Sequence, residues 1–148
     1  MPLKIREAIP KDSQTIFDFI MELAIYEKLP NAVKTTVKEI KDSIFAPNST
    51  VKALICEEDG KAIGYAVYFY NYSTWLGKNG IYLEDLYVNE SKRGKGAGKA
   101  MIKYLAKKAI SEKCGRFEWA CLDWNTPSRE FYESLGAVAL NEWIGYRL

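Results

Sequence analysis

The sequence predicts an α+β fold, a single domain in which a mixed, mostly antiparallel sheet is flanked by helices. Short runs of β-branched and aromatic residues occur between longer amphipathic runs, and an Asp59-Gly60 hairpin signal joins two of the short runs. The 148 residues, 48% of them hydrophobic, are enough for one core and too few for two comfortable domains. We therefore assign residues 1–148 to one domain.

The first third of the chain predicts a strand followed by two helices. Residues 3–7 alternate like a short strand, and residues 12–26 repeat apolar side chains at helical spacing behind a possible Asp12 or Ser13 cap. A second helix is predicted to begin at Thr36, because Thr36 and the glutamate three residues later form a capping box.

The middle of the chain predicts an antiparallel strand pair, a further strand and an amphipathic helix. The pair comprises residues 51–57 and 61–71, joined by the Asp-Gly turn. A strand over residues 81–88 leads through a glycine-rich segment into a helix over residues 98–112, whose lysines face solvent.

The last third predicts a strand, a helix and a closing hairpin. Residues 116–122 read as a buried strand, and a helix opens at Pro127 and closes at Gly136. The tail, residues 137–148, has the pattern of a hairpin. No repeat or linker interrupts this order, which therefore describes one mixed sheet.

Composition excludes several functions. The 21 basic and 19 acidic residues give a net charge of +2, so there is no electrostatic case for a nucleic-acid partner. No apolar run approaches the roughly 20 residues of a membrane helix, and the N-terminus lacks a signal-peptide run, so we expect a cytoplasmic protein without a membrane partner. Histidine is absent, and Cys56, Cys114 and Cys121 lack CxxC spacing. We expect no metal, no histidine-based triad, and buried apolar thiols.

The glycine-rich segment SKRGKGAGKA, residues 91–100, lies between a predicted strand and a predicted helix, where backbone N–H groups can bind an anion. A flexible turn would also explain its glycines. A nucleotide P-loop is excluded because Arg93 stands at the first glycine position and Ala100 replaces the hydroxyl residue. The G-x-G-x-G spacing also differs from the dinucleotide fingerprint. The remaining pattern is Arg93-x-x-Gly96-x-Gly98.

That pattern resembles the acetyl-CoA motif of the GNAT N-acetyltransferase superfamily, whose fold has the same order of elements. The resemblance implies that acetyl-CoA is the co-substrate and that its pyrophosphate binds along the loop. It also implies that the backbone of a bulged strand holds the pantetheine and polarises the thioester. Asn125 and Ser128 are expected to contact the coenzyme, although helix capping is an alternative role. The implied cofactor-binding residues are Leu86, Tyr87, Val88, Arg93, Gly94, Lys95, Gly96, Ala97, Gly98, Lys99, Asn125 and Ser128.

Three further blocks, residues 22–29, 72–88 and 122–137, resemble the diamine (spermidine/spermine) N-acetyltransferases and the related thialysine N-epsilon-acetyltransferases. The resemblance implies an enzyme that acetylates a primary amine of a small diamine, polyamine or lysine-like substrate by direct attack in a ternary complex. It also implies a homodimer. Acetylation of a peptide or protein amine, and a non-catalytic acetyl-CoA-binding module, remain as alternatives.

Amine acetylation needs residues that attract an ammonium, remove its proton and protonate the leaving thiolate. Glu84 and Asp85 are adjacent on a predicted strand, so their side chains should point to opposite faces. By resemblance, Glu84 is the base and Asp85 binds substrate; two solvated carboxylates at a sheet edge are the alternative. Tyr132 matches the family's proton-donating tyrosine, although it could simply pack its helix.

The amine site is expected, again by resemblance, to include Tyr26, Glu27 and Trp75, where a cation can meet a carboxylate and a ring face. Glu118 is a further candidate for substrate contact, but it could equally be an exposed carboxylate on a strand with no role in binding. Tyr146 replaces a family tryptophan, which weakens that assignment. Ser73 stands where the diamine enzymes carry an aspartate, which favours shorter diamines or lysine-like amines over long polycations.

Overall fold

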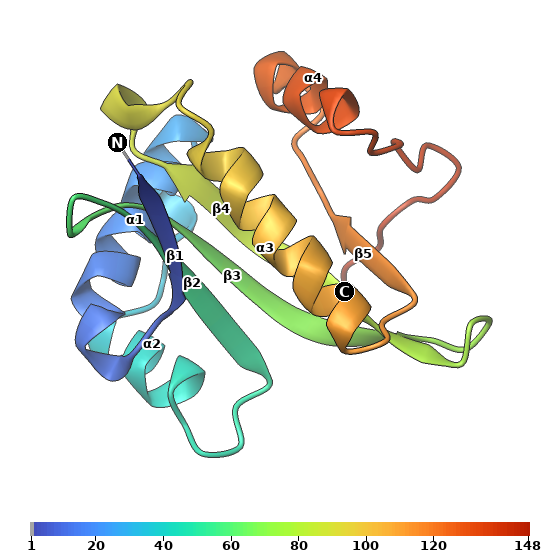
Figure 1. Ribbon diagram of the computed structural model, residues 1–148, viewed down its shortest axis with the longest axis horizontal. Helices are drawn as coiled ribbons and strands as arrows, with labels where there is room; N and C mark the ends of the chain where they lie inside the picture. Colours follow the sequence, from blue (N-terminus) through green and yellow to red (C-terminus); the bar gives the residue numbers. More distant parts are fainter. Residues whose placement is uncertain (1) are drawn as a thin grey trace.

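A computed structural model describes residues 2–148 and contains one five-stranded sheet in the order β1-β2-β3-β4-β5 (Figure 1). Neighbouring strands from β1 to β4 are antiparallel, and β5 runs parallel to β4. The predicted mixed, mostly antiparallel sheet is therefore confirmed. The strands are β1 (Leu3–Glu7), β2 (Val51–Glu58), β3 (Lys61–Ser73), β4 (Lys78–Val88) and β5 (Arg116–Trp119).

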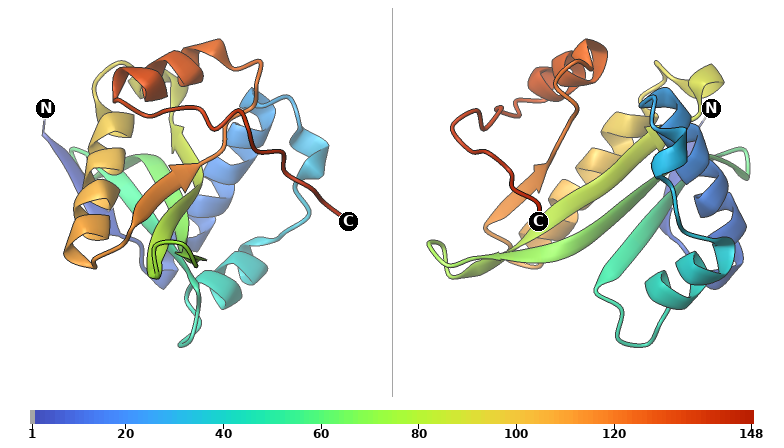
Figure 2. Two further views of the ribbon diagram at one scale, coloured as in Figure 1. Left: turned by 90° about the vertical axis from the view of Figure 1, so that its right-hand side faces the viewer. Right: turned by 180° about the vertical axis from the view of Figure 1, so that it is seen from behind.

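Helices cover both faces of the sheet (Figure 2). One face packs on α1 and α2 through a core that includes Ile16, Phe19 and Tyr65, and the other packs on α3 through a core that includes Tyr68 and Met101. The fourth helix, α4, lies beyond the β5 edge. The helices are α1 (Ser13–Tyr26), α2 (Val37–Ile44), α3 (Ala97–Ser111) and α4 (Thr126–Ser134).

Two local signals in the sequence are confirmed in detail. The hydroxyl of Thr36 accepts a hydrogen bond from the backbone N–H of Glu39 at 3.1 Å and so caps α2. Asp59 and Gly60 have φ angles of +52° and +76° in the β2–β3 turn. Paired positive φ angles match the twist of the flanking strands, which is why Asp-Gly is favoured there.

The pairing of β4 with β5 is short. It runs only from Gly80 opposite Arg116 to Leu83 opposite Trp119, whereas β4 continues to Val88. The predicted strand over residues 116–122 is therefore wrong beyond Trp119, because the following residues turn away from β4. The two strands separate at this point, and a cavity opens between them.

The predicted hairpin over residues 137–148 is wrong. The structure assigns no strand there, although Trp143 N donates to Leu140 O at 3.3 Å and closes a turn. The tail side chains Val138, Ile144 and Tyr146 are exposed. An isolated two-stranded hairpin is marginal in water, and residues 137–148 do not pair with the edge strand β5.

No helix within residues 2–148 is both long enough and apolar enough to cross a membrane.

A partly buried ion pair joins β1 to the start of α1. The carboxylate of Asp12 accepts hydrogen bonds from Arg6 Nη1 at 2.8 Å, Arg6 Nη2 at 2.9 Å and Ile9 N at 2.7 Å. Asp12 precedes α1 as expected, but its side chain bonds to Arg6 and Ile9 and does not cap the helix. The hydrogen bonds from Arg6 hold the pKa of Asp12 below its ordinary value.

We predict that Asp12→Ala lowers the free energy of unfolding by about 2 to 3 kcal/mol at pH 7, because Arg6 loses charged hydrogen bonds in a partly buried site. A depressed carboxyl pKa contributes stability above the unfolded-state pKa, and this contribution is lost as the pH falls through the folded-state pKa. Denaturant unfolding at pH 7 and below pH 3 should therefore show the difference shrinking in acid. Asp42→Ala, which removes an exposed partner of Lys38, is the control and should change little. An equal effect of both substitutions would contradict the prediction.

Candidate functional site

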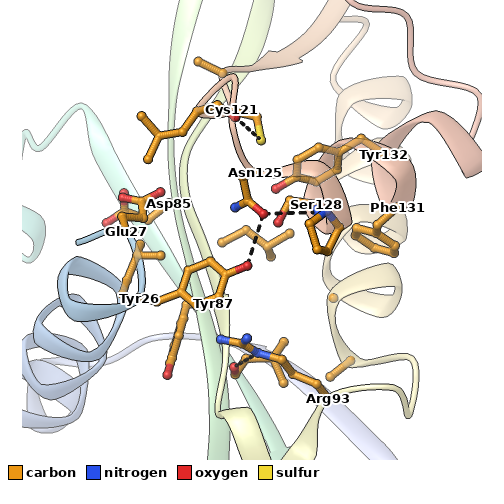
Figure 3. Close-up of a pocket in the computed structure, with 18 of the residues that line it drawn as sticks. Tyr26, Glu27, Asp85, Tyr87, Arg93, Cys121, Asn125, Ser128, Phe131 and Tyr132 are labelled. Atoms are coloured by element: carbon orange, nitrogen blue, oxygen red, sulfur yellow. Dashed lines mark hydrogen bonds between the residues drawn. The ribbon is translucent and has the colours of Figure 1, made fainter. Parts of the chain in front are cut away.

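A cavity of about 830 Å³ lies where β4 and β5 separate (Figure 3). Its walls come from the end of α1, the second half of β4, the glycine-rich loop with the start of α3, the segment after β5, and the start of α4. The cavity residues are Leu23, Tyr26, Glu27, Glu84, Asp85, Leu86, Tyr87, Val88, Arg93, Gly94, Gly96, Ala97, Gly98, Lys99, Ala120, Cys121, Leu122, Asn125, Pro127, Ser128, Phe131, Tyr132 and Arg147.

The glycine-rich loop presents a helix N-terminus to the cavity. Gly94 and Gly96 have φ angles of +79° and +87°, a conformation that favours glycine, and α3 begins directly after them. The first α-helical hydrogen bond of α3 runs from Ala100 N to Gly96 O, so the preceding N–H groups have no acceptor inside the helix. Such N–H groups suit a diphosphate, and the loop therefore fits the coenzyme that the family resemblance implies.

Arg93 and Tyr26 connect the loop to α1 and α4. Arg93 Nε donates to Val88 O at 3.0 Å, and its Cζ lies 4.6 Å from the ring centroid of Tyr26 and 5.3 Å from that of Tyr87. Tyr26 Oη donates to Asn125 Oδ1 at 3.1 Å. These contacts join three elements far apart in the sequence at one point of the cavity wall (Figure 3).

Asn125 serves as a cap and also faces the cavity. It is buried, and its Oδ1 accepts from Ser128 N at 3.3 Å at the start of α4. Its amide nitrogen is directed into the cavity (Figure 3). Helix capping by the oxygen therefore leaves the nitrogen free to donate to a ligand, so the two roles considered for Asn125 are compatible.

Three carboxylates, from Glu27, Glu84 and Asp85, lie together in the cavity wall. Val67 pairs with Asp85 and Tyr68 pairs with Leu83, so Glu84 is the extra residue of a β-bulge. The prediction that Glu84 and Asp85 point to opposite faces is wrong, because the bulge interrupts the strict alternation of the strand and both side chains line the cavity.

Burial in the cavity wall raises the pKa of all three carboxyl groups. For Glu84 and Glu27, burial is the larger cause and the charge of Asp85 adds to it. Burial also raises the pKa of Asp85, and a 2.7 Å hydrogen bond from Tyr65 Oη opposes that shift. The carboxylates repel one another and are partly removed from water, and a bound cation would relieve both costs. The cluster therefore suits a cation.

Tyr132 faces the carboxylates across the cavity (Figure 3). Its ring packs on Trp119 at a centroid distance of 5.2 Å and on Phe131 at 5.4 Å. Burial, with smaller contributions from Cys121, Glu27 and Tyr26, raises the pKa of Tyr132 to about 12. The hydroxyl therefore stays protonated near neutral pH and can donate a hydrogen bond to a ligand in the cavity.

The cysteines divide by position. The prediction of a buried apolar thiol is confirmed for Cys56, whereas Cys114 is half-buried and Cys121 is exposed in the cavity wall, so the prediction is wrong for Cys121. Although the residue is exposed, the cavity wall partly shields its thiol from solvent, which raises the pKa of Cys121 and disfavours the thiolate. Within residues 2–148, no group of three Cys, Asp or Glu residues is arranged to hold a metal ion.

The structure brings most of the expected site residues together and leaves three outside the cavity. Lys95 of the loop is not part of the wall. Trp75 is 90% exposed at the tip of the projecting β3–β4 hairpin (Figure 1). Glu118 lies on β5, where Arg116 Nε approaches its Oε1 at 3.1 Å.

Several cavity residues carried no signal in the sequence. The sequence predicts a strand over Ala120, Cys121 and Leu122, and only the early separation of β5 from β4 brings them into the wall. Arg147 belongs to the tail, for which the sequence predicts a hairpin. Neither placement follows from a local pattern.

Comparisons with known proteins agree with the geometry. The model of the acetyltransferase (GNAT) family matches residues 17–137. Thialysine N-epsilon-acetyltransferase of Sus scrofa is 39% identical over 150 residues, covering 96% of this chain and 88% of the relative. L-ornithine N5-acetyltransferase NATA1 of Arabidopsis thaliana is 41% identical over 85 residues, covering 57% of this chain and 37% of the relative. The solved integron cassette protein VCH_CASS6 of V. cholerae superposes with a TM-score of 0.84 at 27% identity, covering 100% of this chain and 93% of that one.

We predict that Tyr65→Phe raises the pKa of Asp85 further, because the hydrogen bond that favours the ionised carboxylate is lost. A raised carboxyl pKa makes the fold lose stability as the pH rises from the unfolded-state to the folded-state value, so the variant should lose more than the wild type over that range. Carboxyl-carbon NMR titration measures the shift. Tyr68→Phe, whose hydroxyl donates to Glu7, is the matched control. An Asp85 titration equal in both variants would disprove the assignment.

Proposed function

This chain belongs to the acetyltransferase (GNAT) family and is an amine N-acetyltransferase, and we propose that it acetylates the primary amine of a small diamine or lysine-like amino acid by direct attack within a ternary complex. Members of this family use acetyl-CoA as co-substrate. One observation carries the proposal: a single cavity joins a helix N-terminus suited to a diphosphate with a carboxylate cluster suited to an ammonium.

The donor half of the cavity is proposed to hold the coenzyme along β4 and α3. The N–H groups of Gly96, Ala97, Gly98 and Lys99 would bind the pyrophosphate, with Gly94 allowing close approach and Arg93 beside it. Beyond Leu83, β5 no longer pairs with β4, so the edge of β4 from Leu86 to Val88 is open to the pantetheine, although Val88 O already accepts from Arg93 Nε. Asn125 and Ser128 would bind from the opposite wall.

The chemistry divides between the two walls. The coenzyme supplies the acetyl group as an activated thioester. Glu84 and Asp85 attract the acceptor ammonium, and Glu84, whose raised pKa makes it a stronger base than an ordinary carboxylate, accepts the proton of the attacking nitrogen directly or through a water. Tyr132 donates its hydroxyl proton to the departing thiolate. Burial that raises the pKa of Cys121 in the same wall would raise that of the coenzyme thiol too, which favours this transfer.

Acceptor size is inferred from Ser73 and from the names of the relatives. Ser73 Oγ accepts from Leu76 N at 3.2 Å and closes the hairpin turn, and it provides no carboxylate for a distant ammonium of a long polyamine. Thialysine and L-ornithine, named in two relatives, are amino acids with a side-chain amine. Short diamines and lysine-like amino acids are therefore the favoured acceptors, with Tyr26 and Glu27 beside them.

We predict that the purified protein releases free coenzyme A thiol from acetyl-CoA when a short diamine, L-ornithine, L-lysine or thialysine is present. Release above background should be followed with a thiol reagent, and the product located by mass spectrometry. Tyr132→Phe should lower kcat about 10²- to 10⁴-fold, because the leaving thiolate loses its proton donor. The KM for acetyl-CoA should remain close to that of the wild type.

Tyr104→Phe is the matched control, because its hydroxyl donates to Glu7 outside the cavity, and it should retain wild-type turnover. Turnover restricted to peptide or protein amines would replace the small-molecule acceptor. Tight acetyl-CoA binding without turnover of any amine would make the chain a binding module and overturn the proposal.

We also propose that the chain is a homodimer, in which Trp75 reaches the acceptor site of the other copy. Exposed apolar side chains at the hairpin tip and along the tail support this proposal, because such surfaces are usually covered by a partner. They are Tyr72, Trp75, Leu76, Val138, Leu140, Trp143 and Ile144.

We predict that sedimentation at micromolar concentration gives twice the chain mass of 16.9 kDa. Trp75→Ala should lower kcat/KM for the amine about tenfold, since the aromatic contact to the cation proposed across the dimer is lost. The exposed α3 variant Lys107→Ala should sediment and turn over as the wild type does. A fully active monomer would contradict the dimer.

A further inference from the structure

We propose that Arg147 recognises a carboxylate of the acceptor, so that amino acids with a side-chain amine are preferred over diamines of the same length. This inference rests on the proposed function, because it concerns the acceptor of that reaction. It assigns a specificity role to a residue in a segment with no regular secondary structure.

The path of the tail brings Arg147 to the wall of the cavity. After α4 the chain crosses the outer edge of β5 and ends on the side of the sheet covered by α1 and α2 (Figure 2). Glu27, at the end of α1, and the bulge residues Glu84 and Asp85 lie in the wall of the same cavity as Arg147. An arginine therefore shares a wall with the three carboxylates that would receive the ammonium.

The other cations of the cavity wall have different surroundings. Arg93 and Lys99 belong to the glycine-rich loop, and Arg93 donates to Val88 O and stacks on two tyrosines. Among the side-chain hydrogen bonds and ion pairs of residues 2–148, none involves Arg147. Its guanidinium is therefore free to form a bidentate pair with a ligand carboxylate, a geometry that arginine provides and lysine does not.

Charge then separates two classes of acceptor. An amino acid such as L-ornithine carries an ammonium for the carboxylate cluster and a carboxylate for Arg147. The diamine obtained by removing that carboxyl group has no partner for Arg147, and its second ammonium would meet a like charge. The cavity with Arg147 thus favours the amino acid, and the cavity without it should lose that preference.

The experiment compares kcat/KM for acceptors that differ only by the carboxyl group: L-ornithine with 1,4-diaminobutane, and L-lysine with 1,5-diaminopentane. We expect Arg147→Ala to lower kcat/KM about 10- to 100-fold for the amino acids and to leave it unchanged or raised for the diamines. Arg147→Lys should be intermediate, because one cation remains without the bidentate geometry. Lys107→Ala, which removes one cation from the exposed face of α3, should preserve the wild-type ratio.

Several results would overturn the inference and leave the proposed function standing. These are a wild-type preference for diamines, an equal loss for both members of a pair in Arg147→Ala, or a raised acetyl-CoA KM with an unchanged acceptor ratio. Failure of the wild type to acetylate any amine would overturn the proposed function. Calorimetric titration of L-ornithine into wild type and Arg147→Ala then tests Arg147 separately, and equal affinity would overturn the inference as well.

Discussion

The early separation of β4 from β5 is the constraint on which the site depends. β5 pairs with β4 for only four residues and ends at Trp119, whereas β4 runs on to Val88. The backbone of β4 beyond Leu83 therefore lacks a strand partner on that side, and a backbone group without a partner is costly unless a ligand or water satisfies it. The same separation admits the α3 N-terminus at one part of the cavity and the α4 residues at another.

The site also depends on the bulge at Glu84. An unbroken strand would send Glu84 and Asp85 to opposite faces, and only one would reach the cavity. With the bulge, both line it beside Glu27, and burial raises the pKa of each. Carboxylates gathered in this way oppose one another's ionisation, so a bound ammonium relieves their repulsion and its proton has a nearby acceptor. The bulge at Glu84 therefore determines both where the carboxylates lie and how readily they ionise.

Local sequence patterns predicted those features that depend only on neighbouring residues, such as helix caps and turns. The Thr36 cap, the Asp59-Gly60 turn and the glycine-rich start of α3 each depend on a few consecutive residues. The family resemblance located Glu84 and Tyr132, which share the cavity wall. The end of β5, the bulge and the unpaired tail depend on contacts between distant segments, and no periodicity reveals them. Trp75 shows the same limit, since its distance from the cavity follows from how far the hairpin projects.

Direct transfer between two bound substrates is the central claim, and initial rates with acetyl-CoA and the amine varied together test it most directly. Cys121 is the thiol in the cavity wall that could carry the acetyl group instead, but burial raises its pKa and disfavours the thiolate. Double-reciprocal plots should therefore give intersecting lines, and Cys121→Ser should retain turnover. Parallel lines, with an acetyl group found on Cys121 by mass spectrometry, would contradict the account.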